Sequence, residues 1–111
     1  MKVITNNEGA VTILKPLGPL LAGELDELDK SLNALVRDWT RRIVINMTES
    51  GCIDSAGLEL LNRYHQQLSE HGLRLKLCGM SELVRKIFNL TRLSHRLEIY
   101  PDTVAAVRSF V

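Results

Sequence analysis

Residues 49–58, which read ESGCIDSAGL, form the segment of this chain whose residue types are best suited to chemistry. They follow an apolar, β-branched run at residues 42–47 and lead into a helical pattern over residues 55–70, so they are predicted to join a buried strand to a helix. A junction of this kind directs free backbone N–H groups and the positive end of the helix toward one point. Ser55 is therefore expected to expose its hydroxyl at a helix N-terminus, where a phosphate group is electrostatically favoured.

The neighbours of this serine allow both a functional and a purely structural interpretation. Asp54 is a typical helix-capping residue, so Asp54 and Ser55 could do no more than begin the helix, while Gly57 would let another backbone approach closely. A nucleophile elbow needs Gly-x-Ser-x-Gly, but Ile53 occupies the position of the first glycine. A P-loop needs a lysine where Leu58 stands. We therefore predict no catalytic residues and no enzymatic activity.

The histidines and cysteines do not predict a metal or cofactor site. His65, His71 and His95 lack the i,i+4 spacing of paired ligands on a helix. Cys52 and Cys78 are the only cysteines, and we expect both to be free thiols in a reducing compartment. His65 is interpreted as a partly buried histidine with its hydrogen bonds satisfied. We expect neither a bound metal nor a cofactor.

The charge balance and hydropathy of the chain restrict its partners. The 111 residues include 14 Lys and Arg against 13 Asp and Glu, a net charge of +1. Nucleic-acid-binding domains usually carry a basic excess on one face, so we expect no nucleic-acid partner. No apolar run approaches the ~20 residues of a membrane span, and the polar start does not resemble a signal peptide, so we expect a cytoplasmic protein without membrane insertion. Four late basic residues are interpreted as a solvated face, with contact to an acidic partner as the alternative: Arg85, Lys86, Arg92 and Arg96.

Strand-like and helix-like patterns of apolar residues alternate along the chain and predict one α/β domain over residues 1–111, in the order β-β-α-β-α-β-α-β-α. The first two strands are expected to form an antiparallel hairpin, and the later ones to be parallel neighbours separated by helices. The expected strands are residues 2–5, 10–15, 42–47, 73–78 and 97–100. The expected helices cover the leucine stripe of residues 21–39, residues 55–70, and the segments after Ser81 and after Pro101.

Helical and strand periodicity also assign individual side chains to the core. Trp39 ends the apolar stripe of the first helix, and Val104 lies on the inner face of the last. The third helix carries the apolar residues Leu83, Val84, Ile87 and Phe88. Leucine alternates with Arg and Lys over residues 73–78, which predicts a strand with one side facing solvent. Gly72 is expected to end the second helix in a left-handed conformation.

Three segments together resemble the STAS domain, and most of all the single-domain bacterial anti-sigma factor antagonists, also called anti-anti-sigma factors. These are RIVINM at residues 42–47, IDSAGL at residues 53–58 and LRLKLCG at residues 73–79. The resemblance covers essentially the whole chain in order and length. It implies a mixed central sheet, built from an N-terminal hairpin and parallel strands, with about four helices packed largely on one side. It also implies that Ser55 is the phosphorylated serine of the family.

The resemblance further implies a protein partner, a serine kinase that doubles as an anti-sigma factor. In that scheme the unmodified chain binds the kinase and frees sigma, the kinase then phosphorylates Ser55 and is released, and a phosphatase resets the system. We expect a monomer or a weak dimer, whose partner covers the surface around this serine. The residues expected to bind the partner are Asp54, Ser55, Ala56, Gly57, Glu59, Asn62 and Arg63.

The sequence departs from the family pattern in one place. The family often has Gly-Glu-Leu-Asp directly after the second strand, but here Gly18 is followed by Pro19. The letters GELD do occur at residues 23–26, inside the predicted helical stripe, where we interpret them as a coincidence or a shifted loop. The acidic residue that the family places near the phosphorylation site therefore has no evident counterpart. This departure favours an alternative function, a non-switching STAS scaffold or transporter-associated subunit. The alternative would tolerate Ser55→Ala, whereas a switch needs the hydroxyl.

Overall fold

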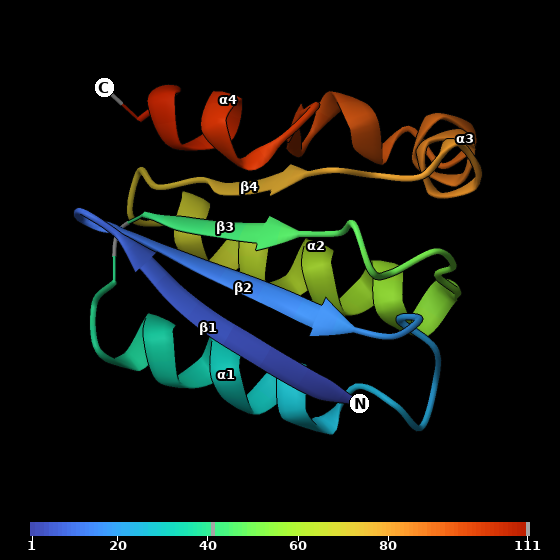
Figure 1. The fold of residues 1–111 in the computed structure, drawn as a ribbon, viewed down its shortest axis with the longest axis horizontal. Helices are drawn as coiled ribbons and strands as arrows, with labels where there is room; N and C mark the ends of the chain where they lie inside the picture. Colours follow the sequence, from blue (N-terminus) through green and yellow to red (C-terminus); the bar gives the residue numbers. More distant parts are fainter. Residues whose placement is uncertain (41, 111) are drawn as a thin grey trace.

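The computed structural model describes residues 1–40 and 42–110, which form a five-stranded sheet in sequence order (Figure 1). The first two strands pair in an antiparallel hairpin, and each later strand adds in parallel to the one before it. The predicted mixed sheet is thus confirmed. The strands are β1 (Lys2–Glu8), β2 (Val11–Leu17), β3 (Ile43–Asn46), β4 (Leu75–Cys78) and β5 (Glu98–Tyr100).

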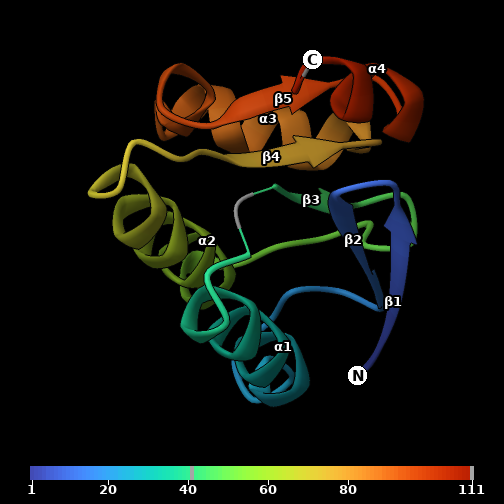
Figure 2. The same ribbon diagram turned by 90° about the vertical axis from the view of Figure 1, so that its left-hand side faces the viewer.

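Three of the helices in the described chain connect successive parallel strands, and they lie on one face of the sheet. Each parallel strand is added at the same edge of the sheet. Since parallel crossovers are right-handed, all the connecting helices then lie on the same face. Figure 2 shows α1 and α2 side by side on that face, and α4, which follows the last strand, packs on the other. The expected placement of the helices largely on one side is confirmed. The helices are α1 (Asp26–Arg37), α2 (Ser55–Ser69), α3 (Glu82–Leu90), the short 3-10 helix η1 (Leu93–His95) and α4 (Thr103–Arg108).

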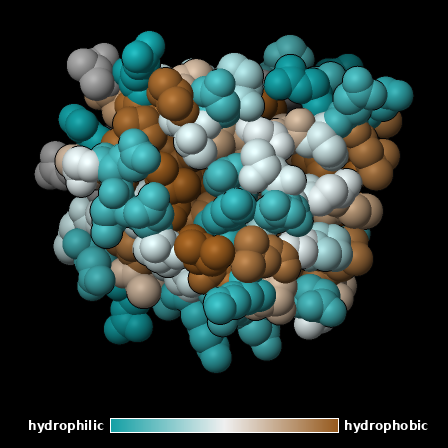
Figure 3. Space-filling view, in the orientation of Figure 1, coloured by the Kyte–Doolittle hydropathy of each residue, from teal (hydrophilic) through white to brown (hydrophobic). Residues whose placement is uncertain are grey.

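The sheet separates two hydrophobic clusters. Ile43 and Ile45 of β3 point into the larger cluster, with Phe88 of α3, and Val44 between them points into the smaller one, with Ala106 of α4. Covered on both faces, β3 is apolar at these three positions. The face of the molecule seen in Figure 3 is largely hydrophilic, with hydrophobic side chains gathered between the hairpin and α4.

The prediction of a solvent-facing side on residues 73–78 holds for Arg74, which is exposed, but was wrong for Lys76, which the C-terminal segment covers. Lys76 is only 6% exposed. Its Nζ donates a hydrogen bond to Ser109 Oγ at 2.7 Å and lies 4.0 Å from the centre of the Phe110 ring, so the C-terminal segment supplies both a polar partner and a cation–π contact. The inward assignment of Val104 was also wrong: it is exposed, since α4 is rotated to bury Ala106. On α3, Leu83 is exposed and Val84 is buried.

Trp39 lies outside the core, contrary to the stripe read from the sequence. Its side chain is 69% exposed and rests against His71, with the ring centres 5.2 Å apart. The residue follows the end of α1 with φ of 59°, and the N–H of Thr40 bonds to the carbonyl of Leu35 across the turn. This is a helix-ending motif whose left-handed position is usually glycine. Gly72, with φ of 72°, occupies the same position after α2, as predicted.

Candidate functional site

Ser55 is the first residue of α2, and its side chain is exposed, as the sequence predicted. Asp54 before it has an extended backbone, and its Oδ1 accepts a hydrogen bond from the N–H of Gly57 at 3.1 Å. The carboxylate therefore satisfies one of the N–H groups that a helix leaves free at its start. Hydrogen bonds from the N–H groups of Ala22 and Gly57 hold the pKa of Asp54 below its usual value, so this carboxylate is ionised at neutral pH.

A second segment, far away in the sequence, holds this junction in place. The N–H of Leu20 donates to the carbonyl of Cys52 at 3.0 Å, and the N–H of Asp54 donates back to the carbonyl of Leu20 at 3.2 Å. Leu20 and Ile53 form an isolated parallel bridge, and the N–H of Ala22 donates to Asp54 Oδ2 at 2.9 Å. The segment after β2 therefore forms one wall of the site, which the sequence analysis did not anticipate.

Gly57 makes this contact sterically possible. A Cβ atom at this position would lie 2.4 Å from the carbonyl oxygen of Leu20 and 2.7 Å from Cγ1 of Ile53. The close backbone approach predicted for Gly57 is confirmed. Gly57 is itself buried, and its lack of a side chain positions the site.

Two serines anchor the loop that leads into α2. Ser50 is fully buried, and its hydroxyl donates to the carbonyl of Pro16 at 3.4 Å. Ser81 caps α3 by accepting from the N–H of Val84 at 3.2 Å, as predicted, and its hydroxyl donates to the carbonyl of Gly51 at 3.4 Å. The loop is thus tied to β2 on one side and to α3 on the other, and Ser55 follows it with an exposed hydroxyl.

Ser55, Glu59 and Asn62 follow one stripe of α2, because residues three or four apart share a face of a helix. They border a shallow hollow of about 250 Å³ between α2 and the end of α3. We call this surface the Ser55 face; it is lined by Ser55, Leu58, Glu59, Asn62, Thr91 and Leu93. The contribution of Thr91 and Leu93 was not predicted, since no local sequence signal shows that the end of α3 returns to the start of α2.

The remaining predicted binding residues do not belong to this face. Arg63 turns toward α1, where its Nη2 lies 3.0 Å from Oδ1 of Asp29. Ala56 is half-buried beside Gly57, and Asp54 is occupied by its two N–H donors. The structure therefore brings together three of the seven residues and gives the others supporting positions.

Residues 23–25 of the GELD letters lie in a loop and Asp26 is the first residue of α1, so their placement inside the first helix was wrong for all but Asp26. Gly23 has φ of 86°, a left-handed conformation that interrupts a helix, and α1 begins only at Asp26. The carboxylate of Glu24 lies 3.6 Å from the amino group of Met1. Asp54 is the acidic residue adjoining Ser55 in sequence, and Ala22 of the same loop contacts it directly.

A metal site, a reactive thiol and a membrane span each require particular features of the described residues. No group of three or more His, Cys, Asp or Glu side chains among them could hold a metal ion. Cys52 and Cys78 are free thiols, as expected, and burial raises the pKa of Cys78 to about 11. None of the helices in the described part of the chain is long and apolar enough to cross a membrane.

The sheet order and the anchored strand–loop–helix junction agree with the family to which this chain belongs, the STAS domain family, whose model matches residues 2–106. A curated relative, the anti-sigma-B factor antagonist of Staphylococcus aureus, is 28% identical over 88 residues, which cover 75% of this chain and 82% of the relative.

Solved structures share the fold at lower identity. A putative anti-sigma factor antagonist from Thermotoga maritima superposes with a TM-score of 0.90 at 20% identity, over 96% of this chain and 92% of that one. The Bacillus cell fate determinant SpoIIAA in its phosphorylated form superposes with a TM-score of 0.74 at 16% identity, over 97% of this chain and 99% of that one. At these identities the likeness establishes the fold alone.

Proposed function

We propose that this chain acts as a single STAS domain that antagonises an anti-sigma factor, and that phosphorylation of Ser55 switches it off. The observation that carries the proposal is the position of Ser55, an exposed hydroxyl on the first turn of α2 beside a loop that both β2 and α3 anchor. The names of the Staphylococcus aureus and Thermotoga maritima proteins support the role, and the phosphorylated form of SpoIIAA supports a phosphate-controlled step.

The fold tolerates a phosphate at this position. The first N–H groups of a helix point toward its start and carry partial positive charge, so an added phosphate is stabilised where Ser55 lies. The side chain of Ser55 is exposed, so the modification displaces no core contact. Phosphorylation should therefore change the surface of the protein and leave its fold intact.

The same phosphate would oppose binding of a partner to the Ser55 face. It adds about −1.5 to −2 charge next to Glu59, at the edge of the hollow that Leu58 and Leu93 line. An unpaired charge or like charges brought together in an interface cost several kcal/mol, on the order of hundreds-fold in affinity. The proposed partner is a serine-kinase anti-sigma factor that covers this face, and a phosphatase would restore binding. This mechanism needs neither catalysis nor a cofactor in the chain.

Calorimetry against a serine-kinase anti-sigma factor from the same genome tests the proposal. Ser55→Ala should bind as the unmodified chain does, and Ser55→Asp should bind on the order of a hundred-fold more weakly. Asn6→Asp is the matched control, because it adds the same charge on exposed β1, toward the hairpin turn at the opposite end of the sheet (Figure 1). Equal affinities for the unmodified chain and Ser55→Asp would contradict switching and favour the non-switching scaffold.

A further inference from the structure

Three arginines lie side by side at the amino ends of the parallel strands, at the opposite end of the sheet from Ser55. Arg42 and Arg74 immediately precede β3 and β4, and Arg96 lies two residues before β5. The strand register, which pairs Ile43 with Leu75 and Lys76 with Glu98, places positions 42, 74 and 96 next to one another. Like charges next to one another repel, so this row of exposed arginines favours a negative charge beside it.

The protein supplies only part of that negative charge. Glu98 is shared, with its Oε2 3.2 Å from Arg74 and its Oε1 3.4 Å from Lys76. Arg42 lies over the ring of Phe110, 6.0 Å from its centre. Arg96 makes no ion pair with any residue that the structure describes. A positive excess therefore remains around Arg74 and Arg96.

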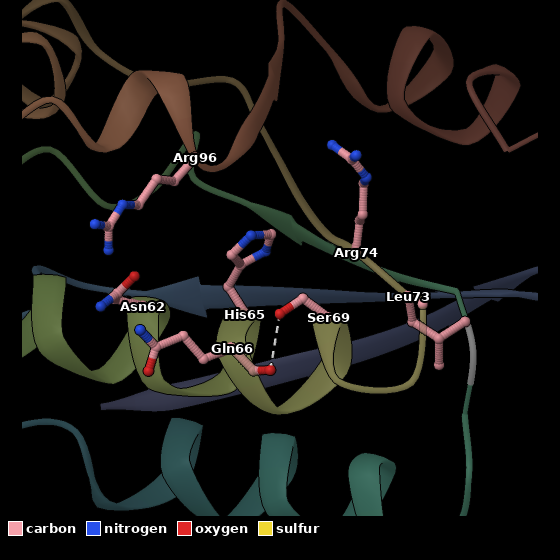
Figure 4. A pocket seen from close by; sticks show the side chains of 8 residues that line it. Asn62, His65, Gln66, Ser69, Leu73, Arg74 and Arg96 are labelled. Carbon is pink, nitrogen blue, oxygen red and sulfur yellow. Dashed lines mark hydrogen bonds between the residues drawn. The ribbon is translucent and has the colours of Figure 1, made fainter.

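These two arginines border a hollow of about 410 Å³, within the usual size of small-molecule sites. Figure 4 shows the His65 side chain rising from α2 between Arg74 on one side and Arg96 on the other. Polar side chains of α2 form the floor of the hollow, namely those of Asn62, His65, Gln66 and Ser69.

Two buried polar atoms at this hollow have no hydrogen-bond partner in the described chain, Oδ1 of Asn62 and Nδ1 of His65. The prediction that His65 has its hydrogen bonds satisfied was therefore wrong. Burial and the charges of Arg74 and Arg96 hold the pKa of His65 below its usual value, against the opposing effect of Glu98, so its imidazole is neutral at neutral pH. Buried polar atoms normally find partners, and these two await a hydrogen-bonding group from outside the chain.

We infer that this hollow binds a small phosphate ester, with the phosphate between the guanidinium groups of Arg74 and Arg96. Guanidinium groups bind phosphate oxygens in a forked geometry, and a dianion supplies the negative charge that the row of arginines lacks. A hydroxyl on the alcohol portion of the ester can donate to Asn62 Oδ1 while all the free phosphate oxygens accept from the arginines, whereas inorganic phosphate would have to use one of its own oxygens as the donor. The site adjoins the Ser55 face at Asn62, which lines both hollows, but its arginines belong to the other end of the sheet and it does not depend on the proposed function.

Nuclear magnetic resonance titration of the His65 imidazole tests this inference, with glycerol 3-phosphate as the probe. The ester should shift the His65 resonance saturably and raise its pKa, because a bound dianion favours the charged imidazole. Inorganic phosphate should bind more weakly, and glycerol should produce no shift. Arg96→Gln should weaken binding of the ester about tenfold. The control Arg85→Gln removes an exposed arginine of α3 that does not line the hollow, and should change nothing.

Three results would overturn the inference. They are the absence of a saturable shift at His65, equal affinities for the ester and inorganic phosphate, and equal weakening by Arg96→Gln and Arg85→Gln.

Discussion

The carboxylate of Asp54 accepts a hydrogen bond from the backbone N–H of Ala22 at 2.9 Å, although the two residues are 32 positions apart. The other oxygen of the same carboxylate caps α2 through Gly57. One side chain thus begins the helix that presents Ser55 and fixes the loop beside it. The geometry of the site depends on this double role.

Asp54→Ala should destabilise the protein, because it removes the cap and the contact to Ala22 together. We expect the melting temperature to fall by about 5 °C, which thermal unfolding followed by circular dichroism would measure. Faster amide hydrogen exchange at Ala22 and Gly57 should accompany the loss. Asp54→Asn keeps an acceptor oxygen, so its melting temperature should fall by less. Equal falls in the two variants would show that the hydrogen bonds of Asp54 do not stabilise the protein as described.

Gly57→Ala should cost about 1–3 kcal/mol of unfolding free energy, despite the better helix propensity of alanine, because its Cβ meets the carbonyl oxygen of Leu20 at 2.4 Å. Urea denaturation would measure the change. Gly51→Ala is the matched control, since a Cβ there meets nothing within 4 Å and should change stability by no more than about 0.5 kcal/mol. If Gly57→Ala left the unfolding free energy unchanged, residues 20–22 would not pack closely against α2.

Stability should fall as the pH drops below about 6.5, because folding holds the pKa of His65 below the 6.5 of an unperturbed histidine. In the range between the folded and unfolded pKa values the unfolded chain binds more protons, so acid favours unfolding. Urea denaturation at a series of pH values would measure this. His65→Gln should flatten the dependence in that range, and an unchanged slope would contradict the assignment. Asp54 affects stability at lower pH, because folding lowers its pKa from 3.8. The ionised carboxylate stabilises the folded protein, and this contribution is lost as the pH falls below 3.8 and the carboxylate is protonated.

Local patterns were sufficient to predict the order of strands and helices and the place of Ser55. Apolar periodicity marked the strands, and the residues Asp54, Ser81 and Gly72 marked helix ends through capping chemistry that acts within a few residues. Trp39 was misplaced because its left-handed conformation overrides helical spacing, and nothing in its residue type signals that conformation.

The parts that could not be predicted come from contacts between distant segments. The burial of Lys76 depends on Ser109 and Phe110, more than thirty residues later. Likewise, the wall that Leu20 and Ala22 form at the site depends on backbone hydrogen bonds, which any residue type except proline can donate. Sequence spacing carries no information about such pairings.

The central claim is that Ser55 is the switch, and mapping the phosphate tests it most directly. The chain would be incubated with ATP and a serine-kinase anti-sigma factor that binds it, and the modified residue identified by fragment mass spectrometry. The account predicts a single phosphate, on Ser55, and none on the Ser55→Ala variant. A phosphate on another residue such as Ser81 or Ser109, or an unmodified chain after treatment with a kinase that binds it, would contradict the account.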